Sequence, residues 1–391
     1  MPRNPNKKDY SAGLPSHLTS FSIIEDPRTG GNKKHHFGEI LFMVVSGLLC
    51  GMNTFAEIEE FCQLQTDWLR KWIKLPAGIP RAQTFSNVFA IIDPKKFNQC
   101  LMTHLKGLPI EFKKQVVAID GKCLRGSHTL NSGKEHAVSA WAVDSGVTLA
   151  QEFVQDKSNE ITAIPELLKM LDIQGCLVTI DAMGTQTHIA GEIIKKEADY
   201  LLALKGNQGN LHKEVIDHFD YALRQIDLKN SPNWSVSQTE ERGHDRYTKQ
   251  TVLSTDYLEW MDPDIRDKWQ ALKSITVVEN ETLEIKSGKE RKKERRYFIS
   301  SCAGNAKELQ RAIKQHWAIE NQCHWVLDTC FREDHNQTRT GNAAKNLGAA
   351  RRIVLNILNA DKTIKKSLPK KRFHALMDIS YREKLLFLSL A

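Results

Sequence analysis

The sequence predicts an α/β protein in which a small all-helical unit precedes a mixed-sheet core, and a β-rich stretch interrupts that core. Three observations support this prediction. Apolar residues recur at helical spacing through the first hundred residues. Short apolar runs then alternate with helical patterns between residues 116 and 226, which is typical of strands buried between helices. Polar, strand-like segments follow between residues 233 and 300.

The helical unit begins near Phe37, after an irregular lead-in. Its pattern is clearest in "FAEIEEFCQLQTDWLRKWI", where apolar residues are three and four positions apart. Pro76 and Pro80 end this pattern, because proline removes a backbone donor and clashes with the preceding turn. Two more helices are predicted on either side of Asp93-Pro94. We expect residues 1–109 to form an accessory domain and a candidate DNA-binding unit.

The core begins with the apolar run "QVVAID", which reads as a buried strand that ends on Asp120. Two strands at 137–143 and 147–154 are predicted to form a hairpin around Asp144-Ser145-Gly146. The following segments are predicted in order as a helix at 158–171, a strand at 175–181, a helix at 184–197 and a strand within 198–207.

A β-rich insertion is expected at about residues 211–305, after a helix at 211–226. The segment "AKELQRAIKQHWAIENQCHWVLDTCF" then predicts one strong amphipathic helix. These elements extend the catalytic domain over residues 110–375. A basic helical segment, 345–391, overlaps its end and carries Arg351 and Arg352. Such a segment suits contact with phosphates, although a solvated helix face explains it equally well.

Composition excludes several classes of protein. In the 391 residues, 41% are hydrophobic and 26% charged, which is ordinary for a globular chain with a real core. No apolar run is long enough to span a bilayer, and no apolar stretch follows the charges of the N-terminus as in a signal peptide, so we expect a cytoplasmic protein. Eight cysteines without a CxxC pair argue against a zinc ribbon or a disulfide framework. A net charge of +8 is compatible with nucleic-acid binding.

Two interior strands end on an acid: "QVVAID" on Asp120 and "CLVTID" on Asp181. The ends of strands in α/β sheets are where sites are commonly built. If the strands are neighbours, the two carboxylates converge and repel each other, so a positive group must lie between them. A hard divalent cation such as Mg²⁺ prefers oxygen ligands and keeps waters for a substrate phosphate.

A two-metal site requires a third acid, and the candidate is Glu320 in "QHWAIENQCHW". Three- and four-residue spacing would place Ala312, Ile313, Trp317, Glu320 and His324 near one face of the predicted helix. A glutamate on a buried face is costly unless it is paired or ligating. Alone, Glu320 is better explained as an ordinary helical charge, and the two aspartates change that balance. A zinc site made of His316, Cys323 and His324 is disfavoured because adjacent helical residues diverge by about 100°.

The chain resembles the DDE transposases of the ISAs type, including the H-repeat-associated proteins of enteric bacteria. The segments that carry the resemblance span nearly the whole sequence: "DPRTGGNKKHHFGEIL", "VVAIDGKCLRGS", "KSNEITAIPELLKMLDIQGCLVTIDAMGTQ", "DYLLALKGNQ", "HWAIENQCHWVLDTCFRED" and "NAAKNLGAARRIVLNIL". The resemblance implies an RNase H-like catalytic fold with a β-rich insertion before the last acid. It implies Asp120, Asp181 and Glu320 as the catalytic, metal-binding triad.

The expected cofactor is a pair of Mg²⁺ ions about 3.5–4 Å apart, with Mn²⁺ as a substitute. The expected partners are double-stranded DNA, as insertion-sequence ends and as target, and a second copy of the chain on that DNA. Related families place a tyrosine, an arginine and a lysine around the glutamate. Here the corresponding positions are Ile313, His316 and Leu327, followed by Asp328. A mechanism that uses that trio, such as a hairpin intermediate, is therefore not predicted.

Several basic residues are candidate DNA contacts, since loop residues near strand ends often bind phosphates. They are Lys122 and Arg125 after the first acid, Lys205 in "ALKGNQ", His244 and Arg246 in "EERGHDRY", and His316, Arg351 and Arg352. Each also has a plain interpretation as a solvated charge, or as support for Glu320 in the case of His316.

Three functions are compatible with these residues. The first is a transposase that cuts DNA and joins the freed end to a target. The second is an inactive, DNA-binding remnant of a decayed element, against which the three intact acids argue. The third is a two-metal nuclease of the same fold that does not join strands.

Overall fold

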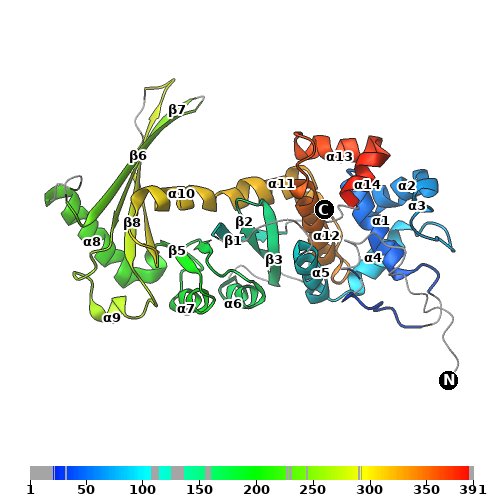
Figure 1. Ribbon diagram of the computed structural model, residues 1–391, viewed down its shortest axis with the longest axis horizontal. Coiled ribbons are helices and arrows are strands. Elements are labelled where there is room, and N and C mark those ends of the chain that lie inside the picture. Colours follow the sequence, from blue (N-terminus) through cyan, green and yellow to red (C-terminus); the bar gives the residue numbers. More distant parts are fainter. Residues whose placement is uncertain are drawn as a thin grey trace.

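The computed structural model describes residues 21, 23–30, 33–106, 114–124, 136–154, 160–225, 228, 231–243, 245–288, 291 and 293–386. The molecule is elongated, with a helical assembly at one end and a long β-sheet reaching to the other (Figure 1). No helix among these residues is both long and apolar enough to cross a membrane.

The N-terminal part is helical, as predicted. Its helices are α1 (Phe37–Leu49), α2 (Phe55–Leu64), α3 (Thr66–Leu69), α4 (Ala82–Ile91) and α5 (Pro94–Lys106). Thr54 begins α2 with a reciprocal capping box, in which Thr54 and Glu57 each accept a backbone N–H of the other. Pro94 begins α5, where its missing donor costs nothing.

Nine strands form one sheet in the order β3-β2-β1-β4-β5-β9-β8-β7-β6. The strands are β1 (Val116–Cys123), β2 (His136–Ala142), β3 (Val147–Val154), β4 (Leu177–Ile180), β5 (Asp199–Leu204), β6 (Trp234–Arg242), β7 (Arg246–Thr255), β8 (Ser274–Glu284) and β9 (Glu294–Ser300). β1, β4 and β5 are parallel neighbours, and every other pairing is antiparallel. The first five strands are the RNase H-like core that the sequence predicted.

The predicted β-rich stretch contains β6, β7, β8 and β9, and these strands continue the core sheet. β5 pairs with β9 through four residues, from Leu201 opposite Ser300 to Leu204 opposite Tyr297. β8, β7 and β6 then extend the sheet outward (Figure 1). The insertion is therefore joined to the core by backbone hydrogen bonds.

Helices cover both faces of the sheet. On one side lie α6 (Glu160–Met170) and α7 (Thr187–Lys195), and on the other α10 (Ala306–His316) crosses the strands (Figure 1). Four shorter or peripheral helices complete the core: η4 (Gly206–Gln208), α8 (Gly209–Gln225), α9 (Pro263–Arg266) and η6 (Glu333–His335). α10 continues into a π-helical turn, η5 (Ile319–His324), and then α11 (Trp325–Thr329).

The C-terminal helices pack against the N-terminal ones. They are α12 (Ala343–Ala360), α13 (Leu368–Met377) and α14 (Ile379–Leu386). α12 contacts α1, α4 and α5, and its apolar side chains share one buried cluster with theirs. Asn346 Nδ2 donates to the carbonyl oxygens of Phe89 (2.7 Å) and Ile92 (2.9 Å). Segments predicted as separate units at the two ends of the sequence thus form one helical assembly.

Candidate active site

The two aspartates lie next to each other on parallel strands. In the pairing of β1 with β4, Val116 lies opposite Leu177 and Ile119 lies opposite Ile180. The next residue after this last pair is an aspartate in each segment, Asp120 in one and Asp181 in the other. Residues in the same register point to the same face, because side chains alternate with a period of two. Asp181 is fixed just beyond β4, where its Oδ1 accepts the backbone N–H groups of Met183 (3.1 Å) and Gly184 (3.3 Å).

Asp120 does not end its strand, and in this respect the sequence prediction was wrong. β1 continues for three residues because Gly121, Lys122 and Cys123 pair with β2 after β4 has stopped. The prediction holds for Asp181, which follows the last residue of β4. The paired acids therefore lie at the step in the sheet where β1 extends beyond β4.

Asp120 is the acid whose ionised form is destabilised by burial and by repulsion from neighbouring carboxylates. Burial and the neighbouring carboxylate of Asp181 raise its pKa to about 7, Glu320 and Glu160 add to this, and a backbone hydrogen bond at Gly121 opposes it. The imidazole Nδ1 of His324 lies 3.5 Å from Asp120 Oδ2. Burial, Arg352 and Lys122 lower the pKa of His324 to about 3, so the ring is neutral and leaves the negative charge uncompensated.

Glu320 is carried by the π-helical turn that interrupts the predicted helix. The backbone N–H of Trp325 donates to the carbonyl of Glu320, five residues earlier, which is the spacing of a π-turn. Such turns occur frequently at functional sites. Glu320 contributes to the raised pKa of Asp120, as Asp181 does, so both other predicted acids act on Asp120.

The predicted single helical face is not observed. Ala312, Ile313 and His324 are buried, whereas Trp317 is 41% exposed and Glu320 is exposed. The extra residue in the π-turn changes the phase of the helix, and three- and four-residue spacing therefore fails across it. Glu320 thus faces solvent, where a ligand can reach it, and not the core.

The donor set of the three acids fits a hard divalent cation. The ligands would be carboxylate oxygens, which Mg²⁺ and Mn²⁺ prefer, and the raised pKa of Asp120 shows that negative charge is in excess. Among the described residues, no three His, Cys, Asp or Glu side chains converge closely enough to enclose a metal ion as they stand. Waters and substrate oxygens would have to complete the coordination of a bound ion.

Lys122, a predicted DNA contact, is enclosed by carboxylates and only 7% exposed. Its Nζ lies 2.7 Å from Asp328 Oδ1, 2.8 Å from Asp334 Oδ1 and 3.7 Å from Glu333 Oε2. Burial disfavours the charged amine, but these carboxylates outweigh it and raise the Lys122 pKa. The prediction of a phosphate contact is therefore corrected: Lys122 ties β1 to the segment that follows Glu320.

Arg351 and Arg352 are also removed from the DNA-binding candidates. They are 1% and 0% exposed, and their Nη1 atoms lie 4.0 and 3.1 Å from Glu333 Oε1. Glu333 is itself buried, and although burial opposes it, Arg352, Lys122 and Arg351 lower its pKa. The basic pattern of α12 thus forms an internal ion cluster and not a binding surface.

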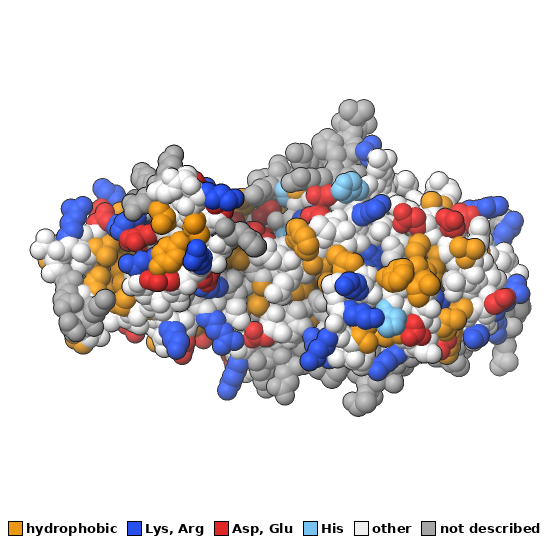
Figure 2. All heavy atoms as spheres, turned by 90° about the horizontal axis from the view of Figure 1, so that it is seen from above, with side chains coloured by type: hydrophobic (Ala, Val, Ile, Leu, Met, Phe, Trp, Pro, Cys, Tyr) orange, Lys and Arg blue, Asp and Glu red, His pale blue; other side chains and the backbone are white. Residues whose placement is uncertain are grey.

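The remaining basic candidates differ in position. Lys205 and Arg246 are exposed and available to a ligand, whereas Arg125 and His244 lie outside the described residues. His316 is half-buried, and its Nδ1 lies 2.9 Å from Thr179 Oγ1, which links α10 to β4. Lys and Arg side chains lie over both halves of the face in Figure 2, mixed with acids and not gathered in one patch.

A fourth acid, Glu160, was missed in the sequence. It begins α6 beneath β1, is buried, and has its Oε1 3.4 Å from His136 Nδ1. A Cβ atom on Gly121 would lie 2.3 Å from the same Oε1, so a larger residue at position 121 would displace this carboxylate from its place beside Asp120. The glycine that directly follows Asp120 was the available signal.

Comparison with known proteins identifies the family. Residues 111–357 match the model of the transposase DDE domain, and residues 18–105 match the model of the region associated with it. YncI of Escherichia coli O157:H7 is 37% identical over 380 residues, which are 95% of each chain. The H-repeat-associated protein YhhI of E. coli K12 is 35% identical over 367 residues, 93% of this chain and 96% of that one.

A solved piggyBac transposase synaptic complex with hairpin DNA aligns with 97% of this chain and 80% of that chain, at a TM-score of 0.44 and 10% identity. A likeness at this level carries no argument about function. The family model and the relatives show the class of enzyme, a DDE transposase that cleaves and transfers DNA strands. The chain belongs to the DDE transposase family.

Proposed function

We propose that this protein cuts DNA at the ends of an insertion element and joins the freed end to target DNA, with Asp120, Asp181 and Glu320 as its catalytic residues. The observation that best supports this is the register of β1 and β4, which places Asp120 beside Asp181. Burial and the neighbouring acids Asp181, Glu320 and Glu160 raise the pKa of Asp120 to about 7, an excess of negative charge that favours binding of a cation. The reaction is a transfer at phosphorus and requires no covalent enzyme intermediate.

Divalent cations held by these acids would activate a water or a DNA 3′-hydroxyl and stabilise the leaving 3′-oxygen. The protein's own part is to hold the acids in place. The parallel register fixes Asp120 beside Asp181, and the two backbone N–H groups orient the Asp181 carboxylate. The ion pairs of Lys122 fix the segment after Glu320 against β1. Lys205 and Arg246 are exposed candidates for DNA phosphates.

Insertion at a target requires two element ends, so we further propose that the protein acts as a homodimer on double-stranded DNA. Two alternatives remain distinct from this proposal: a remnant that binds the ends without cutting them, and a nuclease that cuts without joining.

The test is cleavage and strand transfer on DNA that carries the flanking ends of the gene, with Mg²⁺ or Mn²⁺. Wild type is compared with Asp120→Ala, Asp181→Ala and Glu320→Ala, and with Glu259→Ala as an exposed acidic control far from the site in sequence. We expect metal-dependent joining in wild type and in the control, and a loss of about a hundredfold to a thousandfold in each triad variant, a size typical of lost electrostatic stabilisation. Cutting without joining would favour the nuclease, and binding without cutting would favour the remnant. If Glu320→Ala keeps its activity, Glu320 is not the third metal ligand.

A further inference from the structure

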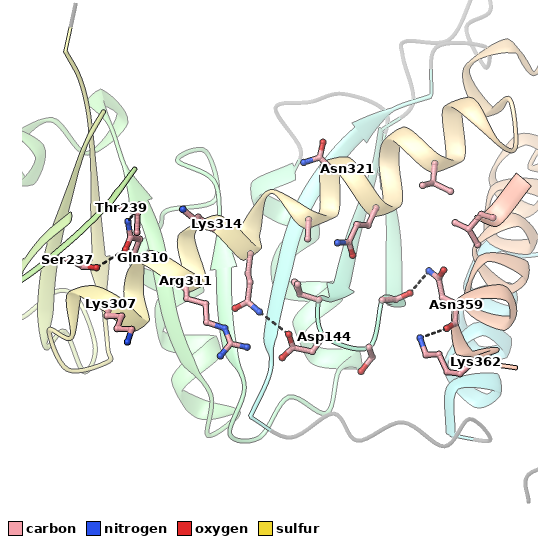
Figure 3. A pocket seen from close by; sticks show the side chains of 18 of the residues that line it. Asp144, Ser237, Thr239, Lys307, Gln310, Arg311, Lys314, Asn321, Asn359 and Lys362 are labelled. Carbon is pink, nitrogen blue, oxygen red and sulfur yellow. Dashed lines mark hydrogen bonds between the residues drawn. The ribbon is translucent and has the colours of Figure 1, made fainter. Parts of the chain in front are cut away.

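A large groove lies on the outer side of α10, apart from the three acids. Its volume is about 1210 Å³, and its walls come from α10, β6, the β2–β3 turn and the end of α12. Figure 3 shows this hollow, with α10 along one side and α12 at the far end. None of the three acids lines it, but Ala318, Asn321 and Gln322, which flank Glu320, do. The helical rod that carries Glu320 is therefore also one wall of the groove.

The charges in the groove are mostly positive. Its lining includes four basic side chains, Lys307, Arg311, Lys314 and Lys362, and one acid, Asp144. Figure 3 shows Lys307 and Arg311 leaving the same side of α10. No carboxylate of the described residues forms an ion pair with either of these two, whereas Lys314 pairs with Glu241. Asp144 accepts a hydrogen bond from Gln315 (2.9 Å), which satisfies part of its charge. Three exposed cations, Lys307, Arg311 and Lys362, are thus left for a ligand.

The walls are held rigidly by hydrogen bonds. The buried amide of Gln310 donates to Thr239 Oγ1 and Gln250 Oε1, both at 2.9 Å, and accepts from Ser237 Oγ at 2.8 Å. At the other end, Asn359 Nδ2 donates to the carbonyl of Gly146 at 2.6 Å and joins α12 to the β2–β3 turn. A binding surface fixed in this way loses little entropy when a ligand binds.

We propose that this groove binds the phosphodiester backbone of DNA at a position outside the scissile bond. The inference rests on the proposed function, since it places the flanking part of a DNA substrate. Lys307 and Arg311 are about 6 Å apart along the helix, which matches about two phosphate intervals of one DNA strand. The lining also includes amide side chains, among them Gln238 and Gln322, which are typical contacts of the DNA backbone. Among the described residues that line the groove there is no aromatic side chain, the usual anchor of a protein partner.

The experiment measures the affinity of full-length protein for DNA of its own gene's ends over a series of salt concentrations. The test variant is Lys307→Gln/Arg311→Gln. The matched control is Lys213→Gln/Arg224→Gln, which removes the same two charges from exposed positions of α8. Lys307→Arg/Arg311→Lys keeps both charges and serves as the rescue. Cleavage is assayed on the same DNA, and unfolding midpoints verify that each variant is folded.

We expect the test variant to bind about tenfold more weakly and its slope of log K against log salt to shrink by about 1.8, because two phosphate contacts are lost. The control and rescue variants keep the wild-type slope. If the test and control variants have equal slopes of log K against log salt while wild type cuts DNA, the proposal that the groove binds DNA is wrong and the proposed function still stands. A reduced slope in a protein that never cuts supports the groove and rejects the function. If a polyglutamate peptide binds wild type and not the test variant while DNA binding is unchanged, the groove takes an acidic protein and the proposal fails.

Discussion

Asp120 shows how a single residue can work against the stability of the fold. Its carboxylate is buried beside Asp181, with Glu320 and Glu160 near enough to add to the repulsion. The neutral imidazole of His324 cannot balance it. A residue of this kind is kept for binding and not for packing, because the same space could hold an uncharged side chain at lower cost.

We therefore predict that Asp120→Asn makes the metal-free protein more stable by about 1–2 kcal/mol while it abolishes DNA cutting, since the amide keeps the shape and removes the repulsion. Urea unfolding at pH 8 in the presence of a chelator measures the first effect. Glu259→Gln, at an exposed position, is expected to change neither property. A loss of stability in Asp120→Asn would mean that the carboxylate is held by favourable contacts.

At the scale of single residues, the sequence predicted roles that depend on neighbouring residues in the chain. Asp120 and Asp181 follow apolar runs, and the register of two adjacent strands brings them together. The role of Lys122 was not predictable, because its partners Asp328 and Asp334 are about two hundred residues away in the chain. The burial of Arg351 was not predictable for the same reason. The sequence pattern of α12 is the same whether its charges face solvent or contact Glu333.

Among the elements, the rod formed by α10, η5 and α11 decides where Glu320 lies. It is tied to β1 by Lys122, which contacts Asp328 at the end of the rod and Asp334 just beyond it. It is tied to β4 by His316 and Thr179. The site thus depends on ion pairs between elements as well as on the acids themselves.

Lys122→Met should cost about 3–5 kcal/mol of unfolding free energy, because it leaves buried carboxylates without their cation. It should also reduce cutting while the salt dependence of DNA binding stays unchanged, since Lys122 touches no phosphate. Chemical unfolding and salt titration of binding measure the two effects. A slope smaller by about 0.9 would instead restore Lys122 as a DNA contact.

Glu333 gives the ion cluster a defined pH dependence. Its pKa in the folded protein lies below the usual 4.5, so its ion pairs contribute fully above that pH and are lost as the pH falls through the folded value. We predict that Glu333→Gln is less stable than wild type by about 3–5 kcal/mol at pH 7, and that this difference shrinks below pH 4.5. Urea unfolding of both proteins at pH 7 and pH 3.5 gives the comparison. A difference that stays constant down to pH 3.5 would show that the glutamate acts through packing alone.

The order and type of the elements followed from periodicity and from proline positions, as in the break between α4 and α5 at Asp93-Pro94. Two features did not. The extension of β1 past Asp120 depends on pairing with β2, and the π-turn at Ile319–His324 leaves no mark in the spacing of apolar residues. Both are set by tertiary contacts, which a local pattern does not contain.

The whole molecule is held together by contacts between its two ends. α12 lies against α1, α4 and α5, and Arg372 of α13 donates to the carbonyl of Leu48 at 2.8 and 3.0 Å. The predicted accessory domain, 1–109, and the predicted C-terminal segment, 345–391, therefore share a core. The sequence predicts these two segments as separate units, because the spacing of apolar residues in a helix does not indicate which other helix it packs against.

This arrangement predicts that residues 110–391 do not fold alone. Removal of residues 1–109 would expose the apolar face of α12, and large exposed apolar patches lead to aggregation. We expect the fragment to be insoluble, or to bind a hydrophobic dye and unfold without cooperativity, and co-expression with residues 1–109 to restore it. A monomeric fragment that unfolds cooperatively would establish the two parts as independent domains.

The orientation of Glu320 depends on the number of residues in the π-turn, Ile319–His324. Deletion of Asn321 or Gln322, both exposed, would leave an ordinary α-helix that still contains Glu320. It would also rotate α10 by about 100° relative to α11, and with it the side chain at position 320. A gene copy with such an in-frame deletion would keep every catalytic acid in its reading frame and yet present a different side chain to Asp120. Counting residues in this turn therefore separates intact copies of the element from copies that only look intact.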